Sequence, residues 1–241
     1  MKLKIITAFH GTVYHSNAFQ DPDIYVPVYG GKTVSKYLPD RSKAMLKDNT
    51  GDNISWVNPF VGPITCLYWA WKNLDKLENP DWIGLNHYRR LFPIRKFFSL
   101  FDKEEKPFIL ISSKNTNMPV LSYAELEYGI GQDLEDLFRE ILKTDEEKAA
   151  YEYFKTVRSF AEKNLFIIPT TELDGYMNFM LRAIKALYKQ FQYQYLEGMQ
   201  YRRRTARMLE FVTAYYLVFM SAGHKYNHIS INYEYPWKGF Y

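Results

Sequence analysis

The sequence predicts a single α/β domain, and three observations lead to this fold class. Short β-rich segments alternate with longer amphipathic segments, which is the pattern of a sheet covered by helices. The chain has 241 residues, of which 47% are hydrophobic, enough for one substantial core. No repeat, low-complexity segment or linker divides it.

The predicted strands are short apolar runs bounded by turn-forming residues. The second run contains Pro27, which cannot donate a ladder hydrogen bond and therefore favours an edge strand or a short extended piece. The third run is a buried strand that ends abruptly in Arg89-Arg90. The strands are expected at residues 2–9, 25–29, 82–88, 107–112, 165–168 and 229–233.

Helices are predicted where apolar residues recur at helical spacing. Residues 35–56 are instead rich in turn formers and predict a long irregular loop, and a loop of this length in a compact domain is usually functional. The helices are expected at residues 63–74, 125–142, 148–162, 172–197 and 204–221, before a mostly irregular tail.

Composition narrows the class of protein. The net charge of +4 is mild, so we expect no nucleic-acid partner. No apolar run approaches the ~20 residues that span a bilayer. The first ten residues lack the apolar region and cleavage site of a signal peptide and predict a strand. The single cysteine, Cys66, excludes an internal disulfide. These features favour a cytoplasmic protein.

The strongest chemical signal is His87-Tyr88-Arg89-Arg90, at the end of the third predicted strand. Ligands of open α/β sheets bind beyond the carboxyl ends of the strands. Two guanidinium groups there can hold one phosphate, and His87 can hydrogen-bond a phosphate or a sugar hydroxyl, or act as a base. A structural ion pair and a core histidine explain the same residues equally well, so the motif alone leaves both interpretations open.

Three further segments carry candidate residues. The polar loop at 48–59 suits sugar binding, although capping and loop support are the commoner use of such residues. The aromatic helix at 67–73 is more often core than ligand platform. The arginine-rich start of the helix at 201–210 either reaches a cleft or is solvated. Phosphate-cradling glycine loops, the Gly-x-Ser-x-Gly elbow and zinc-type histidine spacing are absent from the sequence.

Taken together, these segments resemble one family. It is the group of bacterial capsular and exopolysaccharide glycosyltransferases with the His-Tyr-Arg-Arg motif, long catalogued as a domain of unknown function. The shared pieces, in this order and spacing, are Thr50-Gly-Asp-Asn-Ile-Ser55, Asn58-Pro59, Tyr68-Trp-x-Trp-Lys-Asn73 and Gly84-x-x-His-Tyr-Arg-Arg90. The resemblance runs from about Lys4 to Leu217 and is specific as a joint pattern.

The resemblance implies one GT-A-like, Rossmann-related nucleotide-sugar-binding domain, with a central mixed sheet and a helical C-terminal part. Residues 1–115 would form the nucleotide-sugar-binding half, and residues 116–241 the helical acceptor-side half. The implied activity is that of a hexosyltransferase. The donor would be a UDP-sugar, with UDP-galactofuranose one candidate. The acceptor would be a growing capsular, exopolysaccharide or O-antigen-type glycan, free or lipid-linked.

The sequence also allows two alternative functions and suggests a contact with a membrane. A catalytically weakened sugar- or nucleotide-binding scaffold on the same fold is the first alternative. A phosphotransferase is the second, and the missing glycine loop argues against it. The basic and aromatic residues at 95–101 suggest peripheral contact with the inner face of the cell membrane.

Metal-dependent GT-A enzymes place an Asp-x-Asp pair at the end of a central strand, and this strand has none. We therefore expect Arg89 or Arg90 to neutralise the departing diphosphate in place of a metal, so that no cofactor is needed. A divalent metal is the alternative. Two departures from the family pattern, Pro63 in place of a Glu and residues 128–131 in place of a region with a His, favour altered specificity or reduced activity.

The candidate residues fall into two groups. The resemblance and the strand-end motif make Asp52, His87, Arg89 and Arg90 the catalytic candidates, with Asp52 and His87 foremost as the base and Glu210 a distant third. The candidates for donor or acceptor binding are His10, Lys32, Asn53, Asn58, Tyr68, Trp69, Tyr88, Arg204, Arg207 and Glu210.

Overall fold

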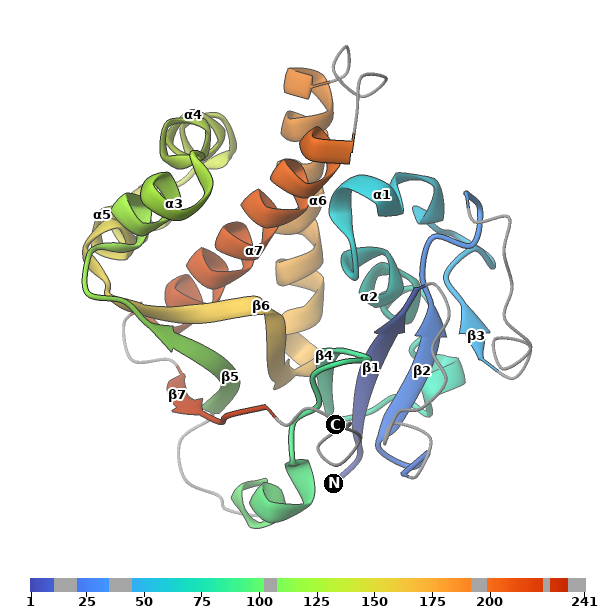
Figure 1. Ribbon diagram of the computed structural model, residues 1–241. Coiled ribbons are helices and arrows are strands. Elements are labelled where there is room, and N and C mark those ends of the chain that lie inside the picture. Colours follow the sequence, from blue (N-terminus) through green and yellow to red (C-terminus); the bar gives the residue numbers. More distant parts are fainter. Residues whose placement is uncertain (11–20, 35–44, 102–107, 192–198, 223–225, 234–241) are drawn as a thin grey trace, which may run out of the picture.

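A computed structural model describes residues 1–10, 21–34, 45–101, 108–191, 199–222 and 226–233. Its strands form one seven-stranded sheet in the order β3-β2-β1-β4-β6-β5-β7 (Figure 1). The strands are β1 (Leu3–Phe9), β2 (Tyr25–Tyr29), β3 (Leu46–Lys47), β4 (Trp82–His87), β5 (Phe108–Asn115), β6 (Ser159–Pro169) and β7 (Asn227–Ser230).

The sheet is mixed, as predicted. β1 is parallel to both β2 and β4, and β2 is parallel to β3. β6 is antiparallel to β4 and β5, while β7 is parallel to β5. The chain leaves β1 toward β2 and β3 on one side and later returns to add β4 on the other. The carboxyl ends of β1 and β4 therefore meet at a switch point of the topology, where α/β sheets bind ligands.

Two hydrophobic clusters pack against the faces of the sheet. Ile6 and Ala8 belong to the larger one, which contains the buried sides of the helices. Ile5 and Phe9 belong to the smaller one, which is covered by the 3-10 segment η5 (Ile94–Leu100) (Figure 1). The helices are α1 (Asn58–Val61), α2 (Ile64–Trp71), α3 (Val120–Tyr128), α4 (Gly131–Ile141), α5 (Asp145–Thr156), α6 (Leu173–Phe191) and α7 (Met199–Ser221).

The helix predicted at 125–142 is wrong as a single element, because the structure has two helices there. Gly129 ends α3 with a left-handed backbone (φ 61°), and α4 begins two residues later. Glycine is the residue that adopts this conformation without a steric penalty. The break matters for the site, since Tyr128 and Ile130 lie on either side of it.

The boundary between the next helix and strand was also predicted wrongly. α5 starts at Asp145, where Thr144 and Glu147 form a capping box, and ends at Thr156. Residues from Ser159 onward then belong to β6, which is much longer than the predicted strand at 165–168. The polar run in the middle of β6 hid this strand, because it interrupts the apolar pattern.

Pro27 does not make β2 an edge strand, because β2 lies between β1 and β3. Pro27 pairs with Thr7 of β1, whereas β3 pairs only with Val28 and Tyr29. The missing N–H of the proline therefore costs no bond to β3. β6 and β7 come from the second half of the chain and complete the same sheet, and the division into two functional halves stays a prediction.

Candidate functional site

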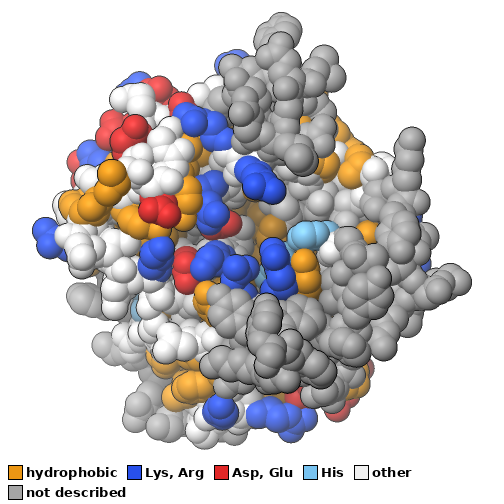
Figure 2. Space-filling model, viewed as in Figure 1, with side chains coloured by type: hydrophobic (Ala, Val, Ile, Leu, Met, Phe, Trp, Pro, Cys, Tyr) orange, Lys and Arg blue, Asp and Glu red, His pale blue; other side chains and the backbone are white. Residues whose placement is uncertain are grey.

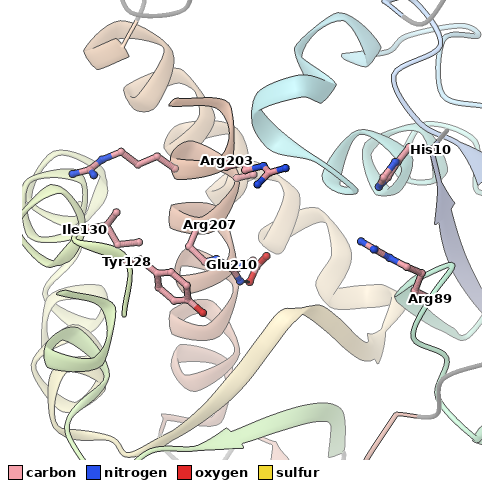
Figure 3. Close-up of a pocket in the computed structure, with 9 residues that line it drawn as sticks. His10, Arg89, Tyr128, Ile130, Arg203, Arg207 and Glu210 are labelled. Carbon is pink, nitrogen blue, oxygen red and sulfur yellow. Dashed lines mark hydrogen bonds and ion pairs between the residues drawn. The ribbon is translucent and has the colours of Figure 1, made fainter. Parts of the chain in front are cut away.

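A pocket of about 890 Å³ lies beyond the carboxyl ends of β1 and β4, bounded on the far side by α7 and by the joint between α3 and α4 (Figure 3). Lys and Arg side chains gather across the centre of this face of the molecule (Figure 2). The pocket is lined by His10, Arg89, Tyr128, Ile130, Arg203, Arg204, Ala206, Arg207 and Glu210.

Helix α7 supplies one wall because its pocket-facing residues follow helical spacing. Arg203, Arg207 and Glu210 are separated by four and three positions, which places them on one side of the helix. The opposite side of α7 is buried against the rest of the protein. There Thr205 donates a hydrogen bond to the Phe60 carbonyl of α1 at 3.1 Å. The arginine cluster seen in the sequence therefore reaches a cleft and is not simply solvated.

Two of the four pocket arginines are neutralised by neighbouring carboxylates. Nε of Arg204 lies 2.5 Å from Oδ2 of Asp133 on α4. Nη1 of Arg207 lies 2.5 Å from Oε2 of Glu210, and its guanidinium carbon lies 4.4 Å from the centre of the Tyr128 ring. These contacts fix the two side chains and remove most of their charge from the pocket.

Arg89 and Arg203 differ from these two arginines. Both are exposed, and neither forms an ion pair with another residue in the described ranges. In Figure 3 they extend toward the same space from opposite walls, with His10 beside them. Two uncompensated guanidinium groups facing one space are suited to a ligand that carries about two negative charges.

A cluster of rings stands at the sheet edge of the pocket, where His10 lines the pocket and His87 and Tyr88 lie behind it. His10 follows β1 and His87 ends β4, and their ring centroids lie 5.4 Å apart. The Tyr88 ring lies 5.2 Å from that of His10 and 4.5 Å from that of His87. The two histidines meet because Ala8 of β1 pairs with His87. All three residues are candidates from the sequence, and their contact follows from the pairing of β1 with β4.

The surroundings of both histidines favour their neutral form. Burial, the nearby His10 ring and the positive charges of Arg89 and Arg90 lower the pKa of His87 to about 3. Burial and the charge of Arg89 also lower the pKa of His10. A pKa this low makes His87 a weak base and suits it to hydrogen bonding instead.

Glu210 is the sole carboxylate among the described residues that line the pocket. Burial raises its pKa above the usual value for a glutamate, and the charge of Arg207 opposes that rise. A carboxylate held at a cationic pocket with a raised pKa is better placed to accept a proton near neutral pH than an ordinary surface glutamate.

Asp48, which the sequence interpretation did not single out, organises the polar loop from inside. Its buried carboxylate accepts hydrogen bonds from the backbone N–H of Gly31 (2.7 Å) and Lys32 (3.1 Å). It also accepts one each from the hydroxyls of Ser55 and Thr65, both at 2.6 Å. Neither Asp48 nor Lys32 lines the pocket.

Three more candidates lie in or beside this loop and outside the pocket lining. Nδ2 of Asn58 donates to the Gly62 carbonyl at 2.9 Å, and Asn53 bonds to the backbone of its own turn. Trp69 is fully buried, with Nε1 donating to the Thr50 hydroxyl at 2.7 Å. These side chains hold the loop against α2, so the loop-support interpretation describes them well.

Asp52, a predicted catalytic residue, is also outside the pocket lining. Oδ1 accepts a hydrogen bond from the Tyr68 hydroxyl at 3.0 Å, and Oδ2 lies 3.7 Å from Nζ of Lys72. Burial and Asp52 together raise the pKa of Tyr68 to about 12. The structure therefore brings His10, the strand-end motif and α7 together, and it leaves Asp52 apart from them.

Both departures from the family pattern can now be placed. Pro63 starts α2 and is not a pocket residue. Tyr128 and Ile130 do line the pocket, so that departure falls within the site. Four residues of the pocket lining were not among the site candidates predicted from the sequence: Tyr128, Ile130, Arg203 and Ala206. Helical spacing from Arg207 was the signal that could have found Arg203.

The segment proposed for membrane contact packs largely against the protein itself. Phe97 and Phe98 pack onto the smaller hydrophobic cluster, and Arg95 pairs with Asp21 at 2.7 Å. In the described ranges, no helix has the length and hydrophobicity needed to cross a bilayer. No group of three or more potential metal ligands of the His, Cys, Asp or Glu type occurs there either.

The fold is that of a GT-A-like glycosyltransferase. The structure of the WbbM bifunctional glycosyltransferase matches 98% of this chain with a TM-score of 0.75 and 19% identity, and the chain spans 45% of that protein's length. The predicted fold class is therefore confirmed. The match to the mannosyltransferase Ktr4p from S. cerevisiae covers 97% of this chain and 70% of that protein at 11% identity. Its TM-score of 0.37 is too low to assign a fold.

The chain belongs to the family described as Domain of unknown function (DUF4422), whose model matches residues 4–221. The sequence predicted a family catalogued as a domain of unknown function, and this match confirms that prediction. No curated protein matches the chain. The capsular role and the sugar specificity stay predictions.

Proposed function

We propose that the protein is a glycosyltransferase whose pocket holds the diphosphate of a nucleotide-sugar between Arg89 and Arg203. The observation that carries this proposal is a pair of guanidinium groups that face one space at the switch point of the sheet and have no carboxylate partner among the described residues. The donor is a UDP-sugar, with UDP-galactofuranose one candidate, and the enzyme is a hexosyltransferase. The acceptor is a growing capsular, exopolysaccharide or O-antigen-type glycan.

In this proposal fixed cations replace a metal. The leaving nucleoside diphosphate gains negative charge as the glycosidic bond to the donor sugar breaks, and preorganised cations stabilise that charge at low reorganisation cost. Arg89 does this at the end of β4, and Arg90 supports the same strand end. The absence of a carboxylate pair at this strand end supports metal independence.

Glu210 becomes our first candidate for the base, ahead of Asp52 and His87. It lines the pocket, whereas Asp52 does not, and its raised pKa contrasts with the low pKa of His87. The base removes the proton from the attacking acceptor hydroxyl. The acceptor would approach along Tyr128 and Ile130, on the helical side opposite the histidines.

Thermal unfolding with a panel of nucleotides tests the donor site. UDP and UDP-sugars should raise the Tm of the wild-type protein, with or without EDTA, because a ligand of the folded state stabilises it. The Arg89→Ala variant should lose the shift. Arg139→Ala, which removes an exposed arginine paired with Asp136 on α4, serves as the matched control and should keep it.

Three outcomes discriminate between the functions. No shift with any nucleotide would exclude the donor site. A shift abolished by EDTA and restored by manganese would exclude the metal-free mechanism. A UDP-sugar shift without hydrolysis or transfer, over a panel of acceptor glycans, would favour the sugar-nucleotide-binding scaffold on the same fold.

A further inference from the structure

The middle of β6 holds two adjacent residues other than glycine with a left-handed backbone, a conformation that is unfavourable for lysine and that asparagine tolerates better. Lys163 and Asn164 have φ values of 59° and 55°, in the left-handed region. Glycine adopts this region freely, whereas a residue with a Cβ atom pays for it in free energy. Strain of this kind persists where the surrounding structure imposes it, and it is frequent at functional sites.

The two residues belong to a bulge that inserts extra residues into β6. Between the pairs Ile111–Phe166 and Ser113–Ala161, β5 advances by two positions and β6 by five, so β6 carries three additional residues. The pairing of β6 with β4 ends at the same place, at Leu85–Phe166. The bulge therefore lies beside the point where β4 runs into the strand-end motif. Bulges at such places redirect side chains.

The bulge brings Lys163 into contact with the C-terminal part of the chain. Its Nζ lies 3.3 Å from the Tyr233 hydroxyl and 2.8 Å from Oε2 of Glu162. The centre of the Tyr233 ring lies 5.5 Å from that ammonium group and 5.7 Å from the guanidinium carbon of Arg90. Tyr233 is thus in contact with one cation from the bulge and one from the strand-end motif.

The other strained residue connects the bulge to the wall of the pocket. The buried Asn164 side chain accepts a hydrogen bond through Oδ1 from the Thr213 hydroxyl at 2.7 Å, and Thr213 also bonds to Tyr176 at 2.9 Å. Thr213 lies one turn beyond Glu210 on α7. The positive charge of Lys163 also acts on Glu210, where it favours the ionised carboxylate.

We propose that Lys163 is a positioning residue of the site, and that the strained bulge is retained because it carries this ammonium group to the strand-end motif. There Lys163 holds Tyr233 against Arg90 and balances the carboxylate of Glu162. If the bulge served the fold alone, glycine at position 163 would provide the same backbone without strain. The effect on catalysis rests on the proposed transferase function.

Two substitutions separate the backbone from the ammonium group. Lys163→Gly relieves the strain and should raise Tm by about 2–4 °C. It also removes the side chain and should lower kcat about tenfold or more, with little change in the KM for the donor. Lys163→Met keeps the strain and should lower kcat similarly without the gain in Tm. Lys163→Arg should restore most of the turnover.

Asn79→Gly is the matched control, since Asn79 also has a positive φ (47°) and lies in an exposed turn before β4. It should raise Tm and leave kcat unchanged. A Lys163→Gly variant with full turnover would overturn the positioning role. A Lys163→Gly variant that gains no stability would overturn the claim of strain.

A second measurement does not depend on sugar transfer. It tests the role of Lys163 even if the wild-type protein proves not to be a transferase. Hydrogen exchange of the intact protein should show faster exchange at residues 227–233 and 88–90 in Lys163→Met than in the wild type. Unchanged exchange at both segments would overturn the proposal. Failure of the proposed function would instead appear as a wild-type protein that neither binds UDP-sugars nor transfers sugar.

Discussion

At the scale of single residues, the chemistry of the pocket depends on which charges have partners. Arg204 and Arg207 each have a carboxylate beside them, while Arg89 and Arg203 have none within the part of the chain that the structure describes. The arginine pairing also fixes Glu210 in the pocket. The four arginines of the pocket thus divide into two that are paired with carboxylates and two that are not.

Replacing Glu210 by Gln tests its proposed role as base. The amide keeps the size of the side chain and a hydrogen-bond acceptor for Arg207, but it cannot take a proton. We expect kcat to fall by about 10²–10⁴-fold, the usual contribution of general base catalysis, while the KM for the donor changes little. Steady-state kinetics check this. Asp52→Asn is the matched control, and a larger loss there would return Asp52 to the role of base.

The low pKa of His87 makes the stability of the fold depend on pH. The unfolded chain binds a proton near pH 6.5, but folded His87 stays neutral down to about pH 3. Its contribution to stability is therefore present above pH 6.5 and is lost as the pH falls toward 3, by at most about 1.4 kcal/mol per pH unit. The His87→Asn variant should lose less stability than the wild type between pH 7.5 and 5.0. Equal losses in denaturant titrations would contradict this.

At the scale of elements, the joint between α3 and α4 sets the shape of the helical wall. Gly129 has a φ of 61°, and a Cβ atom added there would meet no other atom within 4 Å. Any loss of stability in Gly129→Ala therefore comes from the backbone conformation alone and not from a steric clash. Tyr128 and Ile130 depend on this joint for their position in the pocket.

Gly129→Ala should destabilise the fold by about 1–2 kcal/mol, because alanine is disfavoured in the left-handed region. For a chain of this size the Tm should fall by about 2–8 °C. Calorimetry measures the change, and Gln132→Ala, an exposed position on α4, serves as the control. An unchanged Tm would mean that the joint adopts another conformation, and the positions of Tyr128 and Ile130 would then need revision.

At the scale of the whole molecule, the pocket collects residues from both ends of the chain. His10 directly follows the first strand, Arg89 comes after β4, and Arg203 and Glu210 belong to the last long helix. The sheet order brings β1 and β4 side by side, and α7 crosses above β6 (Figure 1). A donor held in this pocket would therefore contact distant parts of the sequence and stabilise the whole fold.

Salt should weaken donor binding if fixed cations hold the diphosphate. Raising the ionic strength from 0.05 to 0.5 M shortens the range of electrostatic attraction, so the Kd for UDP should rise at least about threefold. Titration calorimetry measures this, and uridine, which carries no phosphate, is the control that should respond little. A salt-independent Kd for UDP would argue against charge pairing as the source of affinity.

The sequence by itself determined the fold class and most of the strands, and it led to a prediction of where the site lies. Strand and helix periodicity, turn residues and the arginines at the end of β4 are local signals, and α/β topology relates strand ends to ligand sites. The same local reasoning failed at β6, where the polar residues of the bulge resemble the end of a strand. The positive φ value of Lys163 is not indicated by its residue type, because lysine rarely adopts the left-handed region.

Only the tertiary structure decided which residues of the site act together. Arg204 is paired with Asp133, 71 positions away in the sequence, and Arg207 lies against Tyr128. Asp52 lies in the polar loop at 48–59, which carries part of the family resemblance, yet it is outside the pocket lining. Charge pairing and burial depend on distances between remote parts of the chain, and those distances are fixed only when the helices pack on the sheet.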